Sequence, residues 1–368
     1  MQTIHDKLEK ITDAWNNYFW EYKFCQDQIK FTDEVKTNYY GDILSYFNDT
    51  LNNLSNVKYE STFQKSIFQS VGILQLIYAH QDLIDELLYI FNLPKSSKVD
   101  KSPNREIRNE LVGHPIRRNP RTNEFISSVF FGREFKNGTI HYILYNKGKI
   151  MLSKSLYYSI DEIIIKHRNF LEKYLDLILS KIKMVLKKYQ KQLSELNTLI
   201  NKGIDFFKIV KLVELRYNKI AKEDYLFKSD ILRECFLKQT EHPRYKNVID
   251  LYIKTLKEYL PETIRNIDEL FDVPKKHKYY KPIKIKIVSS NTKPSPITKQ
   301  KELSYEFSKL FENHPVFGIS YFKNKFRRSK IILEELINME NNTSNTLEFY
   351  SSFEFLRILF IKRKLLRR

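Results

Sequence analysis

Cysteine, glycine and long apolar runs are scarce in this chain, and each shortage excludes a class of protein. The two cysteines, Cys25 and Cys235, lie far apart, which argues against a disulfide framework or a cysteine-based zinc site and suits a reducing compartment. The eight glycines form no phosphate-cradling loop, so no nucleotide or other cofactor is implied. No spacing of histidines and carboxylates suggests a metal site.

Apolar segments long enough for a membrane are also missing. No stretch of about 18 uncharged apolar residues occurs, so no membrane span is expected. The first residues carry charges and aromatics every few positions, without the basic segment and apolar run of a secretory signal. We therefore expect a soluble protein of the cytoplasm.

Positive charge is in large excess. The 63 Lys and Arg residues outnumber the 44 Asp and Glu, which gives a formal net charge of +19. This balance predicts a polyanionic partner, with nucleic acid favoured over an anionic membrane surface. The alternative is a composition bias, because Lys, Asn, Ile, Tyr and Phe are all abundant, as in an AT-rich genome.

The periodicity of the first 200 residues is mainly helical. Helices are predicted over residues 4–30 and 33–54, and more strongly over 61–92, where apolar residues recur at steps of three and four. Residues 124–150 are instead rich in Val, Ile, Phe and Tyr, and an Asn-Gly pair within them predicts a β-hairpin. A capping box from Ser159 to Glu162 then predicts a long helix that continues to about residue 197.

A short helix is expected between the long ones. Ser102 has the side chain of an N-cap, and Pro103 suits the first helical position because it lacks the amide that would be wasted there. This helix should run to about Val112, where Gly113 and Pro115 end it.

The remainder of the chain divides into three regions. Residues 201–273 read as a helical region with shorter units at 203–219, 228–238, 245–259 and 262–271. Residues 274–303 form a basic, Pro- and Lys-rich linker or arm with one possible short strand at Ile283–Val288. Residues 304–368 read as a basic C-terminal region of two or three helices. We thus expect a mainly α protein whose first domain, residues 1–200, carries the hairpin.

The segment that could perform chemistry contains Arg108, Asn109 and His114. RNA cleavage without a metal needs a base for the ribose 2′-hydroxyl and a fixed cation for the charge that builds on the phosphate. Histidine titrates near neutrality, and arginine offers a planar fork of donors that suits phosphate oxygens. Asn109 can hydrogen-bond to either residue or to the substrate without adding charge.

The spacing of the arginine and the histidine predicts a turn between them. In a continuous helix the two residues would be roughly 9 Å apart along the axis and on different sides. Gly113 and Pro115 instead favour a His114 just past the helix end, on a turn that can bring its ring toward Arg108. Glu106 and Glu110, four residues apart on the same helix, could pair with Arg105 or orient Arg108 and His114.

The string Arg-Asn-x-x-x-x-His, at the end of a short helix between two long ones, resembles the HEPN superfamily. The resemblance covers about fifteen residues directly and residues 60–195 by the order of helices, with the hairpin as an insertion; residues 200–368 match nothing recognised. It implies a helical bundle and a metal-independent ribonuclease site formed in a dimer. Arg108 would contact the phosphate, Asn109 would occupy the polar position, and His114 would transfer the proton.

The family also implies partners. A toxin or abortive-infection role would make tRNA or another cellular RNA the substrate, and an antitoxin or a larger defence complex a further partner. Basic residues interleaved with aromatics favour contact with single-stranded RNA, the alternative being a solvated face. The candidate RNA-binding residues are Lys275, Lys276, Lys278, Lys281, Arg327 and Arg328.

Two alternatives remain open from the sequence. Arg108 and Glu110 could simply face solvent while His114 caps the helix. The fold could instead serve as a non-catalytic RNA- or protein-binding module. A second string begins at Arg168 and Asn169 but ends in Tyr174, a poor base at neutral pH, so we interpret it as an accident of a charged helix face. One motif per chain makes dimerisation part of the hypothesis.

Overall fold

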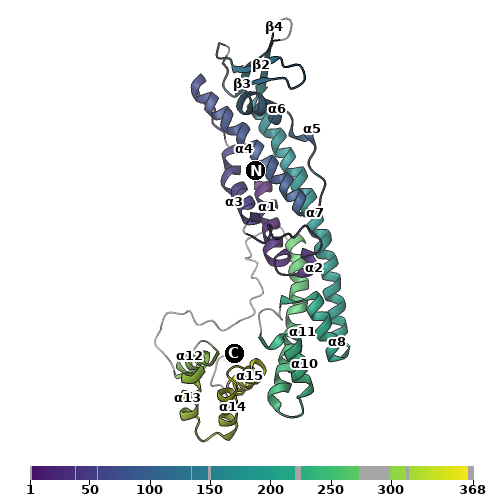
Figure 1. The fold of residues 1–368 in the computed structure, drawn as a ribbon, viewed down its shortest axis with the longest axis vertical. Helices are drawn as coiled ribbons and strands as arrows, with labels where there is room; N and C mark the ends of the chain where they lie inside the picture. Colours follow the sequence, from purple (N-terminus) through teal and green to yellow (C-terminus); the bar gives the residue numbers. More distant parts are fainter. Residues whose placement is uncertain are drawn as a thin grey trace. The chain divides into compact units, whose positions relative to one another are not determined.

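A computed structural model describes residues 2–37, 39–55, 57–133, 135–147, 151–219, 225–272, 299–311 and 315–363 (Figure 1). The chain is mainly helical, as predicted, with one small antiparallel sheet in the described part. It divides into two compact units, the first made of Met1–Trp20 and Cys25–Leu186, the second of Glu21–Phe24 and Lys187–Arg368. None of the described helices has the length and hydropathy to cross a membrane.

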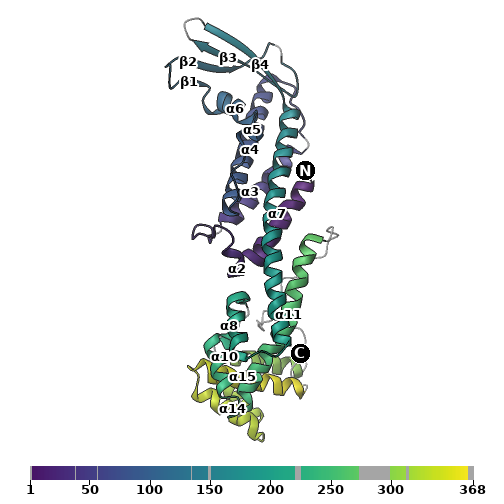
Figure 2. The same ribbon diagram turned by 90° about the vertical axis from the view of Figure 1, so that its right-hand side faces the viewer.

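The first unit is a set of helices that carries a sheet at one end of α4 and α7, as both ribbon views show (Figures 1 and 2). The predicted helix over 61–92 is confirmed as α4, and the long helix after Ser159 is confirmed as α7. The helical elements are α1 (Gln2–Ala14), η1 (Trp15–Phe19), α2 (Lys23–Gln26), α3 (Tyr39–Leu51), η2 (Asn52–Leu54), α4 (Phe63–Ile90), α5 (Lys98–Lys101), α6 (Asn104–Arg108), η3 (Asn109–Gly113) and α7 (Ile160–Asn201).

The sheet has four antiparallel strands in sequence order, β1-β2-β3-β4. Their bounds are β1 (Ile116–Arg118), β2 (Phe125–Phe130), β3 (Thr139–Lys147) and β4 (Met151–Ser159). Side chains alternate between the faces, so Ile140 and Tyr142 of β3 share one face. This inner face packs on helices α4, α6 and α7 in a core that contains Ile77, Ile107 and Ile160.

The predicted hairpin at 124–150 is confirmed as β2 and β3, but the sheet is larger than predicted. The Asn-Gly signal marks the right connection, although only Gly138 takes a positive φ, 76°, and Asn137 does not. The Ile160 amide at the start of α7 donates to the Gly138 carbonyl at 2.9 Å. This contact ties the turn to the helix that supports the sheet.

The caps of two helices test the predicted starts. The Glu162 amide donates to Ser159 Oγ at 3.4 Å, so Ser159 caps α7 as predicted. The prediction of Ser102 as a cap is wrong, because Ser97 caps α5 by accepting from the Val99 amide, and Ser102 follows the end of that helix. The helix α6 begins at Asn104, with no side-chain cap.

The second unit contains the rest of α7 and further helices. Two predictions are corrected here: residues 245–259 and 262–271 form one helix, α11, through Pro261, and the described part of the C-terminal region has four helices rather than two or three. The predicted strand at 283–288 and most of the basic arm lie outside the described residues. The elements are α8 (Phe206–Arg216), η4 (Tyr225–Phe227), α10 (Ser229–Leu237), α11 (Pro243–Asp272), α12 (Lys299–Phe311), α13 (Pro315–Lys325), α14 (Lys330–Asn341) and α15 (Thr346–Lys362).

A pair of histidines is buried in the core of the first unit. His80 on α4 and His167 on α7 lie with their Nδ1 and Nε2 atoms 3.1 Å apart, and Thr50 Oγ1 is 2.7 Å from the other nitrogen of His80. Both rings are almost fully buried, and burial lowers the pKa of each. These residues therefore serve packing in the core and are not positioned at the surface motif.

Acid should destabilise the protein through His80. Burial lowers the pKa of His80 from its ordinary 6.5 to about 4, so the unfolded chain binds a proton before the folded chain does. The free energy of unfolding should be highest above pH 6.5 and fall by a few kcal/mol as the pH drops toward 4. Urea titrations at several pH values measure this loss.

The variant His80→Gln tests whether the histidine is responsible. Glutamine can still hydrogen-bond to Thr50 but does not titrate, so the variant should lose less unfolding free energy over the same pH interval. An equal loss in both proteins would show that other groups control the acid sensitivity.

Candidate functional site

The backbone around the motif widens into a π turn and then leaves the helix. Helix α6 ends at Arg108 and continues as a single π-helical turn, η3, in which the His114 amide donates to the Asn109 carbonyl at 2.8 Å. His114 itself has left the helix, with φ −141° and ψ 62°. π turns are rare and occur frequently at functional sites, although η1, another π turn of this chain, has buried residues in the core.

Arg108 is held by neutral partners. Its Nε donates to Gln75 Oε1 at 3.1 Å, its Nη1 donates to Asn109 Oδ1 at 3.3 Å, and its Cζ lies 4.3 Å from the ring centroid of Tyr78. Throughout the described residues no carboxylate forms an ion pair with it. The guanidinium is therefore oriented while its positive charge stays available for an anion.

Arg105, one turn earlier, has the opposite environment. Its Cζ lies 4.0 Å from the same Tyr78 ring, but its Nη2 forms an ion pair with Asp82 and its Nε donates to Gln81. The charge of Arg105 is thus balanced locally. Of the two arginines over this ring, only Arg108 combines a fixed position with an uncompensated charge.

Gly113 provides the space that Arg108 occupies. A Cβ atom built at this glycine would lie 2.7 Å from Arg108 Nη1 and 3.7 Å from Asn109 Oδ1. Any larger residue at 113 would have to displace the guanidinium. The glycine that the sequence suggested as a helix terminator therefore also permits the arginine to lie across the turn.

The side chains of His114 and Asn109 are both exposed and do not pack in the core. No hydrogen bond joins the side chains of His114 and Arg108 within the described residues. The position of His114 is fixed instead through its carbonyl, which accepts from Arg117 Nη1 at 3.1 Å. The imidazole is therefore open to solvent on an anchored backbone.

The side chains of Glu106 and Glu110, the two carboxylates predicted to support the motif, do not contact those of Arg105 or Arg108 as expected. Glu110 accepts from the Tyr142 hydroxyl at 2.5 Å, and its carboxylate lies 3.6 Å from Arg117 Nη2. These contacts are with strands β3 and β1, so Glu110 stabilises the sheet beside the motif and does not orient Arg108 or His114 directly. Burial, with Glu110 beside it, raises the pKa of Tyr142, which keeps the hydroxyl a donor. Glu106 is exposed, and Arg105 pairs with Asp82 instead of with it.

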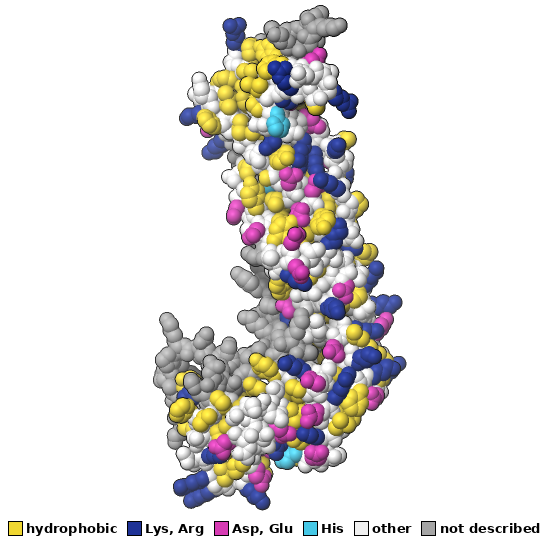
Figure 3. Space-filling model, viewed as in Figure 1, with side chains coloured by type: hydrophobic (Ala, Val, Ile, Leu, Met, Phe, Trp, Pro, Cys, Tyr) yellow, Lys and Arg dark blue, Asp and Glu magenta, His cyan; other side chains and the backbone are white. Residues whose placement is uncertain are grey.

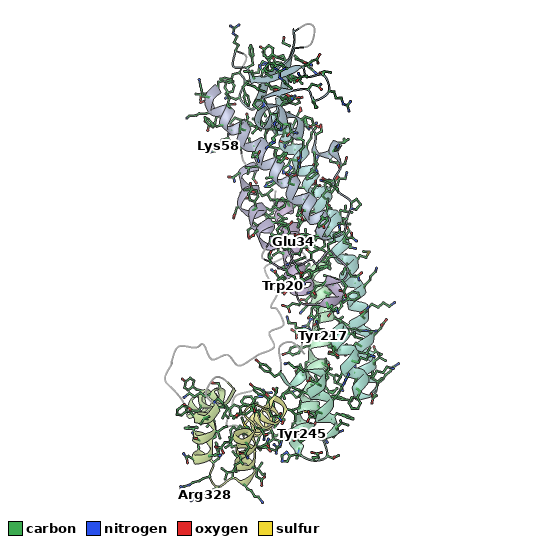
Figure 4. All side chains as sticks on the ribbon, viewed as in Figure 1. Trp20, Glu34, Lys58, Tyr217, Tyr245 and Arg328 are labelled. Atoms are coloured by element: carbon green, nitrogen blue, oxygen red, sulfur yellow. The ribbon has the colours of Figure 1, made fainter. Side chains whose placement is uncertain are left out.

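The remaining candidate residues fall into three groups. In the second string, Arg168 forms an ion pair with Glu172 and the Tyr174 hydroxyl donates to Asp100, so both residues are engaged in structural contacts. Lys275, Lys276, Lys278 and Lys281 lie outside the described residues. Arg327 and Arg328 are exposed in the turn after α13, and Figure 4 labels Arg328.

Sequence reasoning missed the residues that hold Arg108 from a neighbouring helix. Gln75 and Tyr78 lie three residues apart on α4 and therefore share a face of that helix. The available signal was weak, because α4 carries other polar side chains such as Gln81 and Asp82. Nothing in the local sequence indicated that this face meets α6.

Comparison with known proteins yields no match for this chain among protein-family models, curated proteins or solved structures. Within the described ranges, no three His, Cys, Asp or Glu side chains are grouped so that they could hold a metal ion. The side chains that the motif offers for chemistry are those of Arg108, Asn109 and His114.

Gly113→Ala should disable the site without unfolding the protein. The added methyl group must displace the end of the Arg108 side chain, which lies outside the core, so thermal stability should change little while RNA binding and any cleavage fall. Calorimetry and an RNA-binding assay on the same samples measure the two effects.

Gly72→Ala is the matched control. Gly72 lies within α4, where an added Cβ meets nothing within 4 Å, so alanine should raise stability by about 0.5–1 kcal/mol and leave RNA binding unchanged. Equal loss of RNA binding in both variants would contradict the role given to Gly113.

Proposed function

We propose that this protein is a metal-independent endoribonuclease whose site contains Arg108, Asn109 and His114. One observation carries the proposal: Arg108 is fixed by Gln75, Asn109 and Tyr78, all neutral, and keeps an uncompensated charge close in sequence to an exposed histidine. A cation arranged in this way is suited to a phosphate whose charge increases during reaction.

The chemistry follows from the two side chains. The imidazole of His114 accepts the proton of the ribose 2′-hydroxyl, and the 2′ oxygen attacks the adjacent phosphorus. The bond from phosphorus to O2′ forms as the bond to O5′ breaks, which leaves a 2′,3′-cyclic phosphate and, after protonation of the leaving oxygen, a 5′-hydroxyl. Arg108 neutralises the charge on the non-bridging oxygens, and Asn109 orients the guanidinium.

A second copy of the chain completes the site in this proposal. One histidine serves as base, and protonation of the leaving oxygen needs a separate acid. His80 and His167 of the same unit are buried in the core and do not reach the surface. A symmetric dimer would supply the second His114 as well as a second Arg108.

The resemblance of the Arg-Asn-x-x-x-x-His string to the HEPN superfamily supports the same conclusion, as does the net charge of +19. By that resemblance the helices of the first unit form a HEPN-like bundle into which the sheet is inserted. The biological setting would be the cytoplasm, where a toxin or an antiphage defence protein cleaves tRNA or another cellular RNA. An antitoxin or a defence-complex subunit would then restrain it.

A non-catalytic module is the second candidate. One chain offers a single exposed motif histidine, which is enough for an RNA-binding surface but not for a paired acid and base. In that case Arg108 and His114 would contribute only to the affinity for RNA or for a protein partner. The protein would act alone or as a subunit of a larger complex.

Purified protein should cleave RNA in the presence of EDTA, and three variants test the assignment. His114→Ala should reduce the rate roughly 100-fold or more because it removes proton transfer. Arg108→Ala should cause a similar loss. Arg105→Ala is the matched control, since Arg105 lies over the same Tyr78 ring but is neutralised by Asp82, and it should retain most activity.

The outcome that contradicts the proposal is cleavage that persists in His114→Ala or that requires a divalent metal. RNA binding that depends on Arg108 and His114 without any cleavage, tested across tRNA and total cellular RNA, would favour the non-catalytic module. A dimeric site further predicts that activity per mole of protein falls when the protein is diluted below the dissociation constant of the dimer.

A further inference from the structure

We infer that the outer face of the four-stranded sheet binds single-stranded RNA through its exposed aromatic rings and the basic residues around it. This inference rests on the proposed function for the identity of the ligand as RNA. It adds a binding surface outside the motif, in a part of the chain to which the motif assigns no role.

Strand register shows which side chains share this face. Directly paired residues of antiparallel strands lie on the same side, so Arg118 is next to Phe125, Val129 is next to Ile143, and His141 is next to Tyr157. The opposite side carries Ile140 and Tyr142, which are buried against the helices. The first set therefore forms the outer face.

The outer face is unusually apolar for a surface exposed to water. An antiparallel sheet that is covered on one side normally presents polar side chains on the other. Here Ile116 is 71% exposed, Val129 and Tyr157 are each 53% exposed, and Phe125 is 36% exposed. Hydrophobic side chains gather at the sheet end of the molecule, with Lys and Arg side chains beside them (Figure 3).

The aromatic rings on this face are held rigidly. His141 stacks on Tyr157 with ring centroids 3.8 Å apart and an interplanar angle of 21°, and Phe131 meets the same imidazole edge-on at 5.0 Å. Ser155 Oγ lies 2.7 Å from His141 Nε2 and fixes the ring further. A base that stacks on the exposed side of Tyr157 would thus meet a preorganised platform, which reduces the entropy lost on binding.

Charge around the platform favours a polyanion. Within the described residues of the sheet region, five basic side chains form no ion pair and the one acid described there is Glu124. The five cations are Arg118, Arg121, Arg133, Lys136 and Lys154, of which Lys154 pairs with Leu144 and therefore lies on the side of the sheet that faces the helices. In the neighbouring helices, by contrast, Lys101 pairs with Asp85 and Arg105 pairs with Asp82. The sheet therefore concentrates uncompensated positive charge next to its aromatic face.

The sheet follows the motif directly in the chain and is joined to it by hydrogen bonds. The first strand begins at Ile116, two residues after His114, and the Ser128 amide of β2 donates to the Pro115 carbonyl at 2.8 Å. Arg117 on β1 donates to the His114 carbonyl. An RNA strand with its scissile phosphate at Arg108 could extend directly onto the sheet, where unpaired bases stack and a duplex, whose bases are already stacked, does not.

Binding is tested in the His114→Ala background, where cleavage does not interfere. Fluorescence anisotropy with a labelled single strand and with the same sequence as a duplex should show a preference for the single strand. Tyr157→Leu keeps apolar area but removes the ring, so the dissociation constant for the single strand should rise roughly 5-fold or more. Tyr89→Leu, at a tyrosine on α4 with similar exposure, should leave the dissociation constant unchanged.

Val129→Lys distinguishes RNA binding from binding of an apolar protein partner, because the two alternatives predict different changes in the affinity for single-stranded RNA. A platform for RNA should bind the single strand more tightly when a cation is added, and should lose that gain as salt increases. If the face covers a second copy of the chain, the same variant should dissociate dimers and leave RNA affinity unimproved, which would overturn the inference.

Absence of any RNA binding, or equal affinities for Tyr157→Leu and the parent, would overturn the inference as well. Because cleavage plays no part in this assay, its result is independent of the test of the nuclease. If the sheet binds RNA but the parent protein does not cleave it, the proposed chemistry is rejected and the binding surface is kept. If the parent protein cleaves RNA but the sheet does not bind it, only the binding surface is rejected.

Discussion

The charge of Arg108, held in place without being neutralised, is the interaction on which the rest of the site depends. A lone arginine at a protein surface samples many rotamers, and one paired with a carboxylate has little attraction left for a phosphate. The amide oxygens of Gln75 and Asn109 and the Tyr78 ring orient the guanidinium without compensating it. Gly113 leaves the space it needs.

These contacts around Arg108 form because one apolar core joins elements that are distant in sequence. Ile77 of α4, Ile107 of α6 and Tyr142 of β3 belong to the same buried cluster, so the helix that supplies Tyr78 and the helix that ends at Arg108 are packed together. Tyr142 extends the arrangement outward by donating to Glu110. The sheet, the motif and its supporting helix are thus stabilised by the same burial of apolar surface.

The parts that local sequence could predict are those in which local periodicity decides the structure. The helices α4 and α7 and the β2–β3 hairpin were predicted because apolar spacing and a capping serine act over a few residues. Strand β4 was missed, since its Ser153, Lys154 and Ser155 resemble a loop and its structure depends on pairing with β3. Pro261 suggested a break, but α11 continues through it. In the site, Arg108 and His114 could be selected from the sequence, whereas Tyr78 lies thirty residues away and is brought there only by tertiary packing.

The chemistry of the RNA ends tests the central claim most directly. RNA incubated with the protein in EDTA is digested and its products are analysed by mass spectrometry, in parallel with the same strand carrying 2′-O-methyl groups. Attack by the 2′ oxygen, assisted by His114 and Arg108, predicts 2′,3′-cyclic phosphate and 5′-hydroxyl ends and no cleavage of the methylated strand. Products with 3′-hydroxyl and 5′-phosphate ends, or cleavage of the methylated strand, would contradict the account.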